Sequence, residues 1–404
     1  MTSPNRSTAD PGLFLHMGNR LEKLVDELSR ILETPLGSPF DTETIVVQSR
    51  GMQRWLCMQI ARRRGIFANG AFPFPNAFVH QLCRCIDPAL EDPEQSPFHP
   101  STMMFRLLSL LPDCIQRPGF EPLRAYLQDD ADKRMRLALA EKIADLFDQY
   151  QVFRPDLILQ WEAGRQQHWQ ARLWRRLAAA GGEGAHRARL RQRLVEAMAD
   201  GQGTLAELPE RVSVFGISYL PPFHLEVLTA LSRRVPVHVF FVNPCREYWA
   251  DIAGRREAVR IVRRYADQAA EPGPDLHLEE GNRLLAATGT LGRDFLGLAV
   301  DCGAQITEHF EAPGSDRLLN RIQSDILHLR DPVGASGGVL DASVQIHACH
   351  SPMREVEVLH DQLLDLFETD PGLLPRDVLV MAPDIERYGP LIHAVFDAPG
   401  EDRV

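Results

Sequence analysis

The sequence predicts an α/β protein built on a parallel sheet, with a helical block inserted into the sheet and the start of a second α/β domain. Two observations predict this class. Apolar runs of strand length alternate with helical periodicity in two regions of the chain, residues 13–64 and 212–243. Between them, residues 76–205 place their apolar side chains at helical spacing. A strand and helix order that alternates in this way favours a parallel sheet.

The alternation begins near the N-terminus. Leu13–Met17 is a short apolar run, and Arg20–Leu32 spaces its apolar residues at helical intervals. Thr44–Gln48 supplies a second strand, and Met52–Arg64 supplies a second helix. We therefore expect a β-α-β-α unit at the start of the fold.

The central block and the return of the sheet follow from the same patterns. Long amphipathic segments carry the apolar residues of the block, among them Met103–Leu111, Lys133–Tyr150 and Arg187–Ala199. Strands then return on either side of one helix, which starts after two prolines. These elements are Val212–Gly216, the helix His224–Arg234 and Val235–Asn243.

A third unit is expected after the loop-like stretch Asp331–Gly338. Ser343–Cys349 and Asp377–Ala382 read as strands on either side of the helix Glu355–Phe367. Ser351 and Pro352 suit the N-cap and first position of that helix. So few residues follow the second strand that we expect the chain to be a fragment of a longer protein.

Composition places the chain among soluble globular proteins. It has 404 residues, 44% of them apolar and 25% charged, which suits two to four domains. It lacks an apolar run of the ~18 to 20 residues that a membrane helix needs, and its first residues do not resemble a signal peptide. We therefore expect a cytoplasmic protein. The seven cysteines lack a CxxC spacing, so reduced thiols without a structural zinc are expected.

A net charge of −11 argues against a protein that coats nucleic acid, yet residues 50–64 carry five arginines and no carboxylate. Arg62, Arg63 and Arg64 suit the end of a helix through its dipole, or alternatively a basic patch. Arg50 and Arg54 lie near the start of the same helix, where the dipole disfavours cations. The position of these two arginines near the helix start therefore needs another explanation.

Catalytic motifs are missing where this fold class usually has them. A P-loop needs G-x-x-x-x-G-K-[ST], but His16–Leu24 has one glycine and no Gly-Lys pair. Val214–Pro222, where an acidic pair for Mg²⁺ would stand, has no carboxylate. Pro155, Asp156 and Glu162 only imitate a nuclease signature, because Gly164 replaces its lysine. We expect no catalytic residue in this chain.

Metal-capable side chains are present, but they do not converge. On a strand, His347 and Cys349 would face one side and His350 the other, so ordinary strand positions are expected. Cys83 and Cys85 are best interpreted as buried or half-buried thiols, because residues two apart on a helix face different directions. The sequence therefore predicts no metal site.

Two helical clusters leave alternatives open. Asp145 and Asp148 share one face of a helix, either as a solvated face or as acceptors that read a base such as cytosine. The second cluster suits phosphate contacts or, with equal weight, a plain exposed helix. Its members are Arg187, Arg189, Arg191 and Arg193.

Long strings in order along nearly the whole chain resemble the RecC family, the gamma subunits of exodeoxyribonuclease V. Only the first eighteen residues and residues 270–340 match loosely. The matching strings are Val47–Leu56, Ala144–Tyr150 with Arg154 and Pro155, Phe215–Ser218 with Leu220–Pro222, Asn243–Arg246, and His350–Pro352 with Arg354–Asp361.

This resemblance implies a degenerate superfamily 1 helicase-like fold, related to P-loop NTPases, that has lost its ATPase motifs. It implies a first helicase-like domain in two parts with a helical insertion between them, then a linker and the truncated start of a second helicase-like domain. The corresponding ranges are 1–80 and 209–330 for the first domain, 81–208 for the insertion, 331–342 for the linker and 343–404 for the second domain.

The family also implies a function. A RecC-like subunit clamps RecB-like and RecD-like partners together, separates the strands of forked duplex DNA and scans the 3′ single strand for the Chi signal. This serves the repair of double-strand breaks by homologous recombination. ATP and Mg²⁺ would belong to the partners, and this chain would need no cofactor. Two other hypotheses remain: an ATP-driven helicase in its own right, and a protein scaffold without DNA contact.

The family's Chi-contacting positions carry over along the matching strings. They fall on Gln48, Arg50, Arg54, Phe74, His80, Asp145, Leu146, Asp148, Arg154 and Arg187. Four of them depart from the enterobacterial pattern, which has Thr, Gln, Leu and Trp at positions 50, 54, 74 and 80. Arginine suits guanine where glutamine suits adenine, and histidine stacks less broadly than tryptophan. We therefore hypothesise that the chain reads a different octamer-like signal, or reads Chi weakly.

Overall fold

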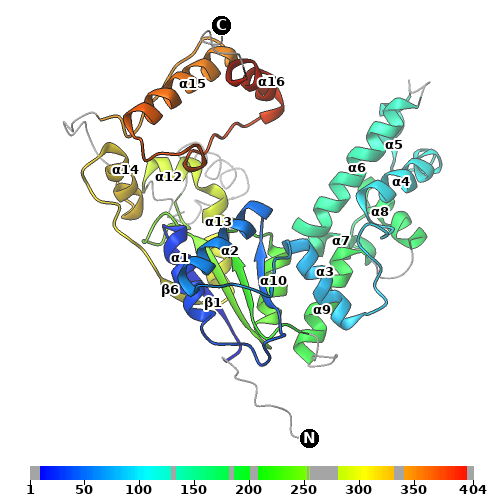
Figure 1. Cartoon of the computed structure of the whole chain (residues 1–404). Coiled ribbons are helices and arrows are strands. Elements are labelled where there is room, and N and C mark those ends of the chain that lie inside the picture. Colours follow the sequence, from blue (N-terminus) through cyan, green and yellow to red (C-terminus); the bar gives the residue numbers. More distant parts are fainter. Residues whose placement is uncertain are drawn as a thin grey trace, which may run out of the picture. The chain divides into compact units, whose positions relative to one another are not determined.

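The computed structural model describes residues 10–128, 133–181, 186–200, 208–252, 254, 281–331 and 341–397. The chain divides into two compact units (Figure 1). The larger unit comprises Met1–Pro313 and Ile322–Gly334, and the smaller comprises Gly314–Arg321 and Ala335–Val404. Each unit is described by itself.

A six-stranded sheet, parallel throughout, forms the centre of the larger unit, in the order β3-β2-β4-β5-β1-β6. The predicted α/β class and parallel sheet are therefore confirmed. The central strands are buried on both faces, as expected for a parallel sheet covered by helices. The strands are β1 (Gly12–Gly18), β2 (Glu43–Val47), β3 (Gly70–Ala71), β4 (Val212–Phe215), β5 (Pro236–Val242) and β6 (Gln305–Glu308).

Helices cover both faces of this sheet. On one face α1 (Leu21–Ile31) and α2 (Arg50–Arg64) bury a cluster that includes Leu24, Leu56 and Phe240. The other face is covered by a larger cluster, to which several helices contribute. They are α3 (Pro75–Ile86), α10 (Pro222–Leu231), α12 (Arg283–Thr288) and α13 (Thr290–Asp301).

The predicted helical block is confirmed, and it has its own core. Phe147, Trp161 and Trp174 are fully buried and meet edge to face, which suits aromatic packing. The last helix of the block packs against α3 and α10 and so joins the block to the sheet. The block contains α4 (Pro100–Ile115), α5 (Glu121–Tyr126), α6 (Arg134–Phe153), α7 (Pro155–Glu162), α8 (Trp169–Ala180) and α9 (Arg187–Asp200).

The smaller unit differs from the prediction. Its helix α15 (Pro352–Thr369) is present as expected, and Ser351 Oγ accepts a hydrogen bond from the N–H of Arg354 at 3.3 Å. The predicted strands 343–349 and 377–382 are wrong, because neither pairs with another strand among the described residues. The remaining elements are α14 (Leu318–Leu327), which spans both units, a 3₁₀ turn (Pro375–Asp377) and α16 (Ile385–Phe396).

Apolar side chains in those two strand-like segments stay exposed, with Ile346 at 93% and Met381 at 83%. An extended segment needs a partner strand to satisfy its backbone and bury one face, so apolar β-branched composition alone does not produce a strand. Residues 332–340 of the predicted linker lie outside the described residues. The domain boundaries stay predictions.

Within the described ranges, no helix has the length and apolar character that a membrane crossing requires.

Candidate nucleic-acid interface

The end of β2 leads directly into α2 through a two-residue turn. Ser49 has an extended backbone, and its hydroxyl accepts a hydrogen bond from the N–H of Met52 at 3.1 Å. This N-cap starts the helix at Arg50. Gln48, Arg50 and Arg54 are thus held, exposed, at the carboxyl end of the sheet, where ligands of open α/β sheets usually bind.

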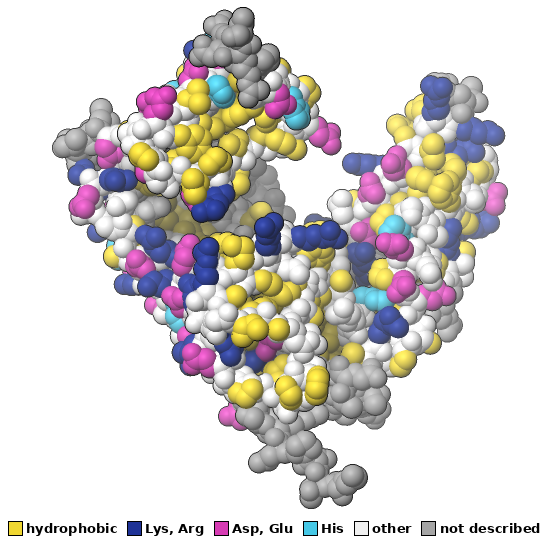
Figure 2. Space-filling view, viewed as in Figure 1, with side chains coloured by type: hydrophobic (Ala, Val, Ile, Leu, Met, Phe, Trp, Pro, Cys, Tyr) yellow, Lys and Arg dark blue, Asp and Glu magenta, His cyan; other side chains and the backbone are white. Residues whose placement is uncertain are grey.

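The arginines at the two ends of α2 differ in their partners. Arg63 donates to Asp26 on α1 at 2.6 Å, and Arg64 donates to the carbonyl oxygen of Leu32. The two arginines near the start of α2 make no hydrogen bond or ion pair with any residue that the structure describes. Figure 2 shows Lys and Arg side chains gathered over the rim of the larger unit where α2 begins. These charges remain available to an external anion.

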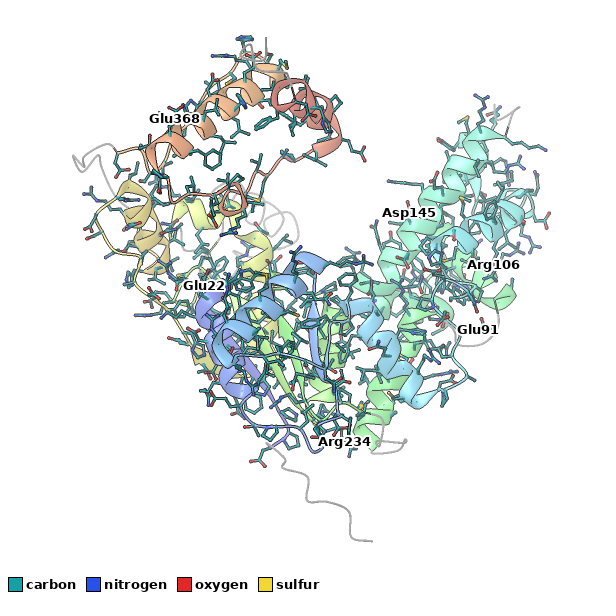
Figure 3. The ribbon with its side chains drawn as sticks, in the orientation of Figure 1. Glu22, Glu91, Arg106, Asp145, Arg234 and Glu368 are labelled. Atoms are coloured by element: carbon teal, nitrogen blue, oxygen red, sulfur yellow. The ribbon has the colours of Figure 1, made fainter. Side chains whose placement is uncertain are left out.

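A second strand end lies beside this turn. The N–H of Val47 donates to the carbonyl of Pro73 at 3.1 Å, which continues the pairing of β2 and β3 to the ends of both strands. Phe74 follows at once as the N-cap of α3, and its side chain is 45% exposed. His80 lies further along α3, with Nε2 at 2.9 Å from the carbonyl oxygen of Glu91, which is labelled in Figure 3.

The helical block contributes a third group. The prediction that Asp145 and Asp148 lie one turn apart on a helix is confirmed by α6, and Figure 3 labels Asp145. Their environments differ, because Asp145 is exposed while the side chain of Asp148 is 24% exposed. Leu146 is half-buried beside them. Arg154 lies exposed between α6 and α7, and its guanidinium has no partner among the described residues.

Asp148 is the most perturbed of the predicted site residues. Burial raises the pKa of its carboxyl, although the nearby charges of Arg187 and His99 act in the opposite direction. Arg187 lies 3.4 Å away, and its backbone N–H donates to the side chain of Gln151 at 3.0 Å. Oδ1 of Asp148 accepts no hydrogen bond from any described group. This oxygen is itself buried, and the Arg187 guanidinium is its charged neighbour.

A pocket of about 430 Å³ lies between α3, α9 and residues 87–99. It is lined by two predicted residues, His80 and Arg187, and also by His99 and Arg193. Its volume is in the range of small-ligand pockets, roughly 300–1,000 Å³. The other predicted DNA-contacting residues do not line this pocket. The structure therefore places the predicted residues in three locations: this pocket, the strand ends, and α6 with the turn that follows it.

Sequence reasoning missed His99 as a pocket residue. It lies at the end of an irregular segment and is the N-cap of α4, with Pro100 at the first helical position. A residue before such a proline indicates a helix start and carries no signal for binding. Cys83 also lines the pocket, and burial raises its pKa to about 12, which agrees with the interpretation of an inert buried thiol.

For two of the four arginines of α9, the suggested phosphate contact needs correction. Arg191 is buried and pairs with Asp156 at 2.7 Å and with Glu226. Arg189 pairs with Glu162 at 2.6 Å. Because these side chains bind α9 to α7 and α10, they are not available for phosphates, and the helix is not plainly exposed either.

Fold and surface together define an α/β protein with a helical insertion, whose strand ends carry arginines without internal partners. Residues 13–329 match the family model described as the RecC N-terminal domain. The chain therefore belongs to the RecC family.

The chain is similar to proteins named RecBCD enzyme subunit RecC from several bacteria. It is 39% identical to that of Escherichia coli over 97% of this chain and 38% of the relative. For Haemophilus influenzae the identity is 36%, over 96% of this chain and 40% of the relative. For Mycolicibacterium smegmatis the identity is 32%, over 95% of this chain and 34% of the relative. The chain thus spans well under half the length of these relatives.

Proposed function

We propose that this chain is a non-catalytic, DNA-binding and scaffolding part of an exodeoxyribonuclease V complex, with a superfamily 1 helicase-like fold. It would assemble with RecB-like and RecD-like subunits in the cytoplasm, help to separate the strands of a fork and scan the 3′ single strand for a Chi-like signal. The name of its relatives, RecBCD enzyme subunit RecC, supports this assembly.

One observation carries the DNA-binding part of the proposal. Arg50, Arg54 and Arg154 are exposed and have no partner among the described residues, although the chain as a whole is acidic. Their guanidinium groups are therefore free to contact an anion from outside the chain. Gln48 beside them offers the bidentate amide that suits adenine, and arginine suits guanine or phosphate.

The turn between β1 and α1 supports a role without ATP. In P-loop proteins the corresponding turn holds phosphates on backbone N–H groups. Here the side chain of Asn19 donates to the carbonyl of Glu311 at 2.8 Å and accepts from its N–H at 2.9 Å. The Glu311 carboxylate lies 3.2 Å from Lys23. The main chain of Glu311 thus occupies the turn where a phosphate would bind. Its carboxylate pairs with Lys23, the cation that a phosphate would need.

The test is single-strand binding by the 404-residue chain at several salt concentrations. Each phosphate contact to single-stranded DNA contributes roughly −0.7 to the slope of log K against log salt. The double variant Arg50→Gln and Arg54→Gln is expected to reduce that slope by about 1.4. Arg63→Gln is the matched control, because this arginine lies on the same helix but already pairs with Asp26.

An unchanged slope in the double variant would contradict the DNA-binding part and favour a protein scaffold without DNA contact. DNA-stimulated ATP hydrolysis by the isolated chain would favour the helicase alternative. The altered-signal hypothesis has its own test in reconstituted holoenzyme. Undiminished recognition of the enterobacterial Chi sequence would contradict it.

A further inference from the structure

Three side chains that bind metals well meet beside the first strand of the sheet. His16 lies on β1, Glu27 on α1 and His309 directly after β6 (Figure 1). One ligand atom from each lies within 4.8 Å of the other two, and His16 Nδ1 is 4.0 Å from a Glu27 oxygen. His309 lies far from His16 and Glu27 in the sequence, so no spacing motif indicates the cluster.

Two nitrogen atoms of this cluster are buried and have no hydrogen-bond partner in the part of the chain that the structure describes. They are Nδ1 of His16, a residue only 4% exposed, and Nε2 of His309. An unpaired buried polar atom costs about 1–3 kcal/mol, so such atoms call for an explanation. A bound ion that accepts both lone pairs would provide one.

The surroundings prepare His16 to act as a ligand. Burial lowers its pKa to about 4, so the ring is neutral at pH 7 and offers a lone pair. Its second nitrogen, Nε2, lies 3.1 Å from Nδ1 of His238 on β5. When Nδ1 binds an ion, Nε2–H donates to His238, the kind of outer contact that orients a metal-binding histidine.

Arg30 is the main feature that opposes a cation. Its guanidinium donates to both oxygens of Glu27, with Nε at 2.8 Å from Oε2. A carboxylate has about four lone-pair sites, so an ion and Arg30 can share it. The Arg30 side chain is 67% exposed and can also turn into solvent. Its charge nevertheless weakens binding, which makes Arg30 a useful probe.

We propose that His16 Nδ1, His309 Nε2 and the Glu27 carboxylate bind one divalent ion of the zinc class. Two imidazoles and a carboxylate suit Zn²⁺ better than Ca²⁺ or Mg²⁺, which prefer oxygen ligands. Bonds of about 2.0–2.1 Å require the ligand atoms to approach by roughly 1 Å, within reach of the Glu27 side-chain torsions. Glu27 and His309 line an open pocket of about 370 Å³, which gives an ion access from solvent.

The ion would tie together the edge of the sheet. β6 pairs only with β1 among the described strands, and its own side chains are exposed, so little burial holds it. A ligand from the residue after β6 and another from β1 would fix this edge strand to its neighbour and to α1. Binding to the folded chain alone then raises its stability.

The experiment is a titration of the metal-free 404-residue chain with Co²⁺ and Zn²⁺, with reductant present. We expect one Co²⁺ per chain, with visible bands typical of nitrogen and oxygen ligands and without a sulfur-to-cobalt charge-transfer band. Zn²⁺ should displace it and raise the melting temperature. His309→Gln should weaken binding at least about 100-fold, more than loss of an outer-shell partner usually does.

Two further variants make the result decisive. Arg30→Gln removes the competing cation and should tighten binding several-fold, whereas a purely structural cluster would not respond in this way. His328→Gln is the control, because it removes a half-buried imidazole outside the cluster and should leave binding unchanged. Binding that His309→Gln leaves unaltered, or a sulfur-ligated Co²⁺ spectrum, would overturn the proposal.

Discussion

A half-buried charge cluster between α7 and α9 gives a prediction whose size can be calculated from the structure. Glu162 accepts from Arg189 at 2.6 Å and lies 2.7 Å from Nε2 of His186. Burial alone would raise the pKa of this carboxyl, but the hydrogen bonds and charges of His186 and Arg189 outweigh it and lower the pKa to about 2. We predict that Glu162→Gln destabilises the chain in a pH-dependent way.

The magnitude follows from linkage. Lowering a glutamate pKa from 4.5 to about 2 corresponds to about 3 kcal/mol of stability at neutral pH. Because the folded-state pKa is the lower one, the unfolded chain binds the proton first as the pH falls. The stabilisation is complete well above pH 4.5, falls to about 2 kcal/mol at pH 3.5 and disappears as the pH passes below about 2.

The assay is urea unfolding at pH 7, 5.5, 4.5 and 3.5, followed by tryptophan fluorescence. Trp174 is fully buried and its indole N–H lies 3.3 Å from a Glu162 oxygen, so the signal reports on this cluster. We expect Glu162→Gln to cost about 2 to 3 kcal/mol at pH 7, and the difference from the natural sequence to shrink by about 1 kcal/mol by pH 3.5. Glu141→Gln, an exposed change on α6, should stay within about 0.5 kcal/mol. A difference that stays constant over this pH range would refute the charge-pairing argument.

Two other changes test the packing of the sheet. Arg211 donates to both oxygens of Glu43, at 2.9 and 2.6 Å, so Arg211→Met should cost about 3–5 kcal/mol in urea unfolding by leaving a buried carboxylate unpaired. Adding Glu43→Leu should recover much of that loss, and a double variant no more stable than the single one would contradict this reasoning. Gly216 has φ +67°, and a Cβ there would lie 2.7 Å from Met52 Cε, so Gly216→Ala should cost about 1–2 kcal/mol or more. Gly303→Ala is the control, because Gly303 has φ +72° but open space around it, so this change introduces backbone strain without a steric contact. If the two variants lost the same stability, the Met52 contact would be negligible.

The strands that sequence reasoning found are those with a buried pattern. β1, β2, β4 and β5 are apolar and buried over most of their length, so their composition reveals them. β3 has only two residues, and β6 is Gln-Ile-Thr-Glu with every side chain exposed. Such edge strands form because a neighbouring strand offers backbone hydrogen bonds. Their own amino-acid composition therefore does not identify them as strands.

The candidate interface likewise contains residues that the sequence could place together and residues that only the fold brings together. Strand-to-helix order alone placed Gln48, Arg50 and Arg54 together at a strand end, because a two-residue turn fixes their separation. The pairing of Asp148 with Arg187 joins two helices that are distant in the sequence, and only the folded block brings them to 3.4 Å. Periodicity describes which face of a helix is buried, but it does not identify the neighbour on that face.

The difference between paired and unpaired arginines makes the proposed DNA contact compatible with an acidic chain. At about 0.15 M salt the Debye length is about 8 Å, so most of the net charge of −11 is screened from a strand bound at one rim. Arg191 and Arg211 are themselves buried and pair with carboxylates of the chain, so they cannot add to that contact. Arg50 and Arg54 can, because nothing described in the chain neutralises them. The dependence of DNA binding on salt should therefore reflect the number of local arginines that contact phosphates, not the net charge. The net negative charge gives the chain no long-range electrostatic attraction to DNA. Under the proposed function, rapid capture of DNA would come from the partner subunits, and this rim would supply contacts once the strand has arrived.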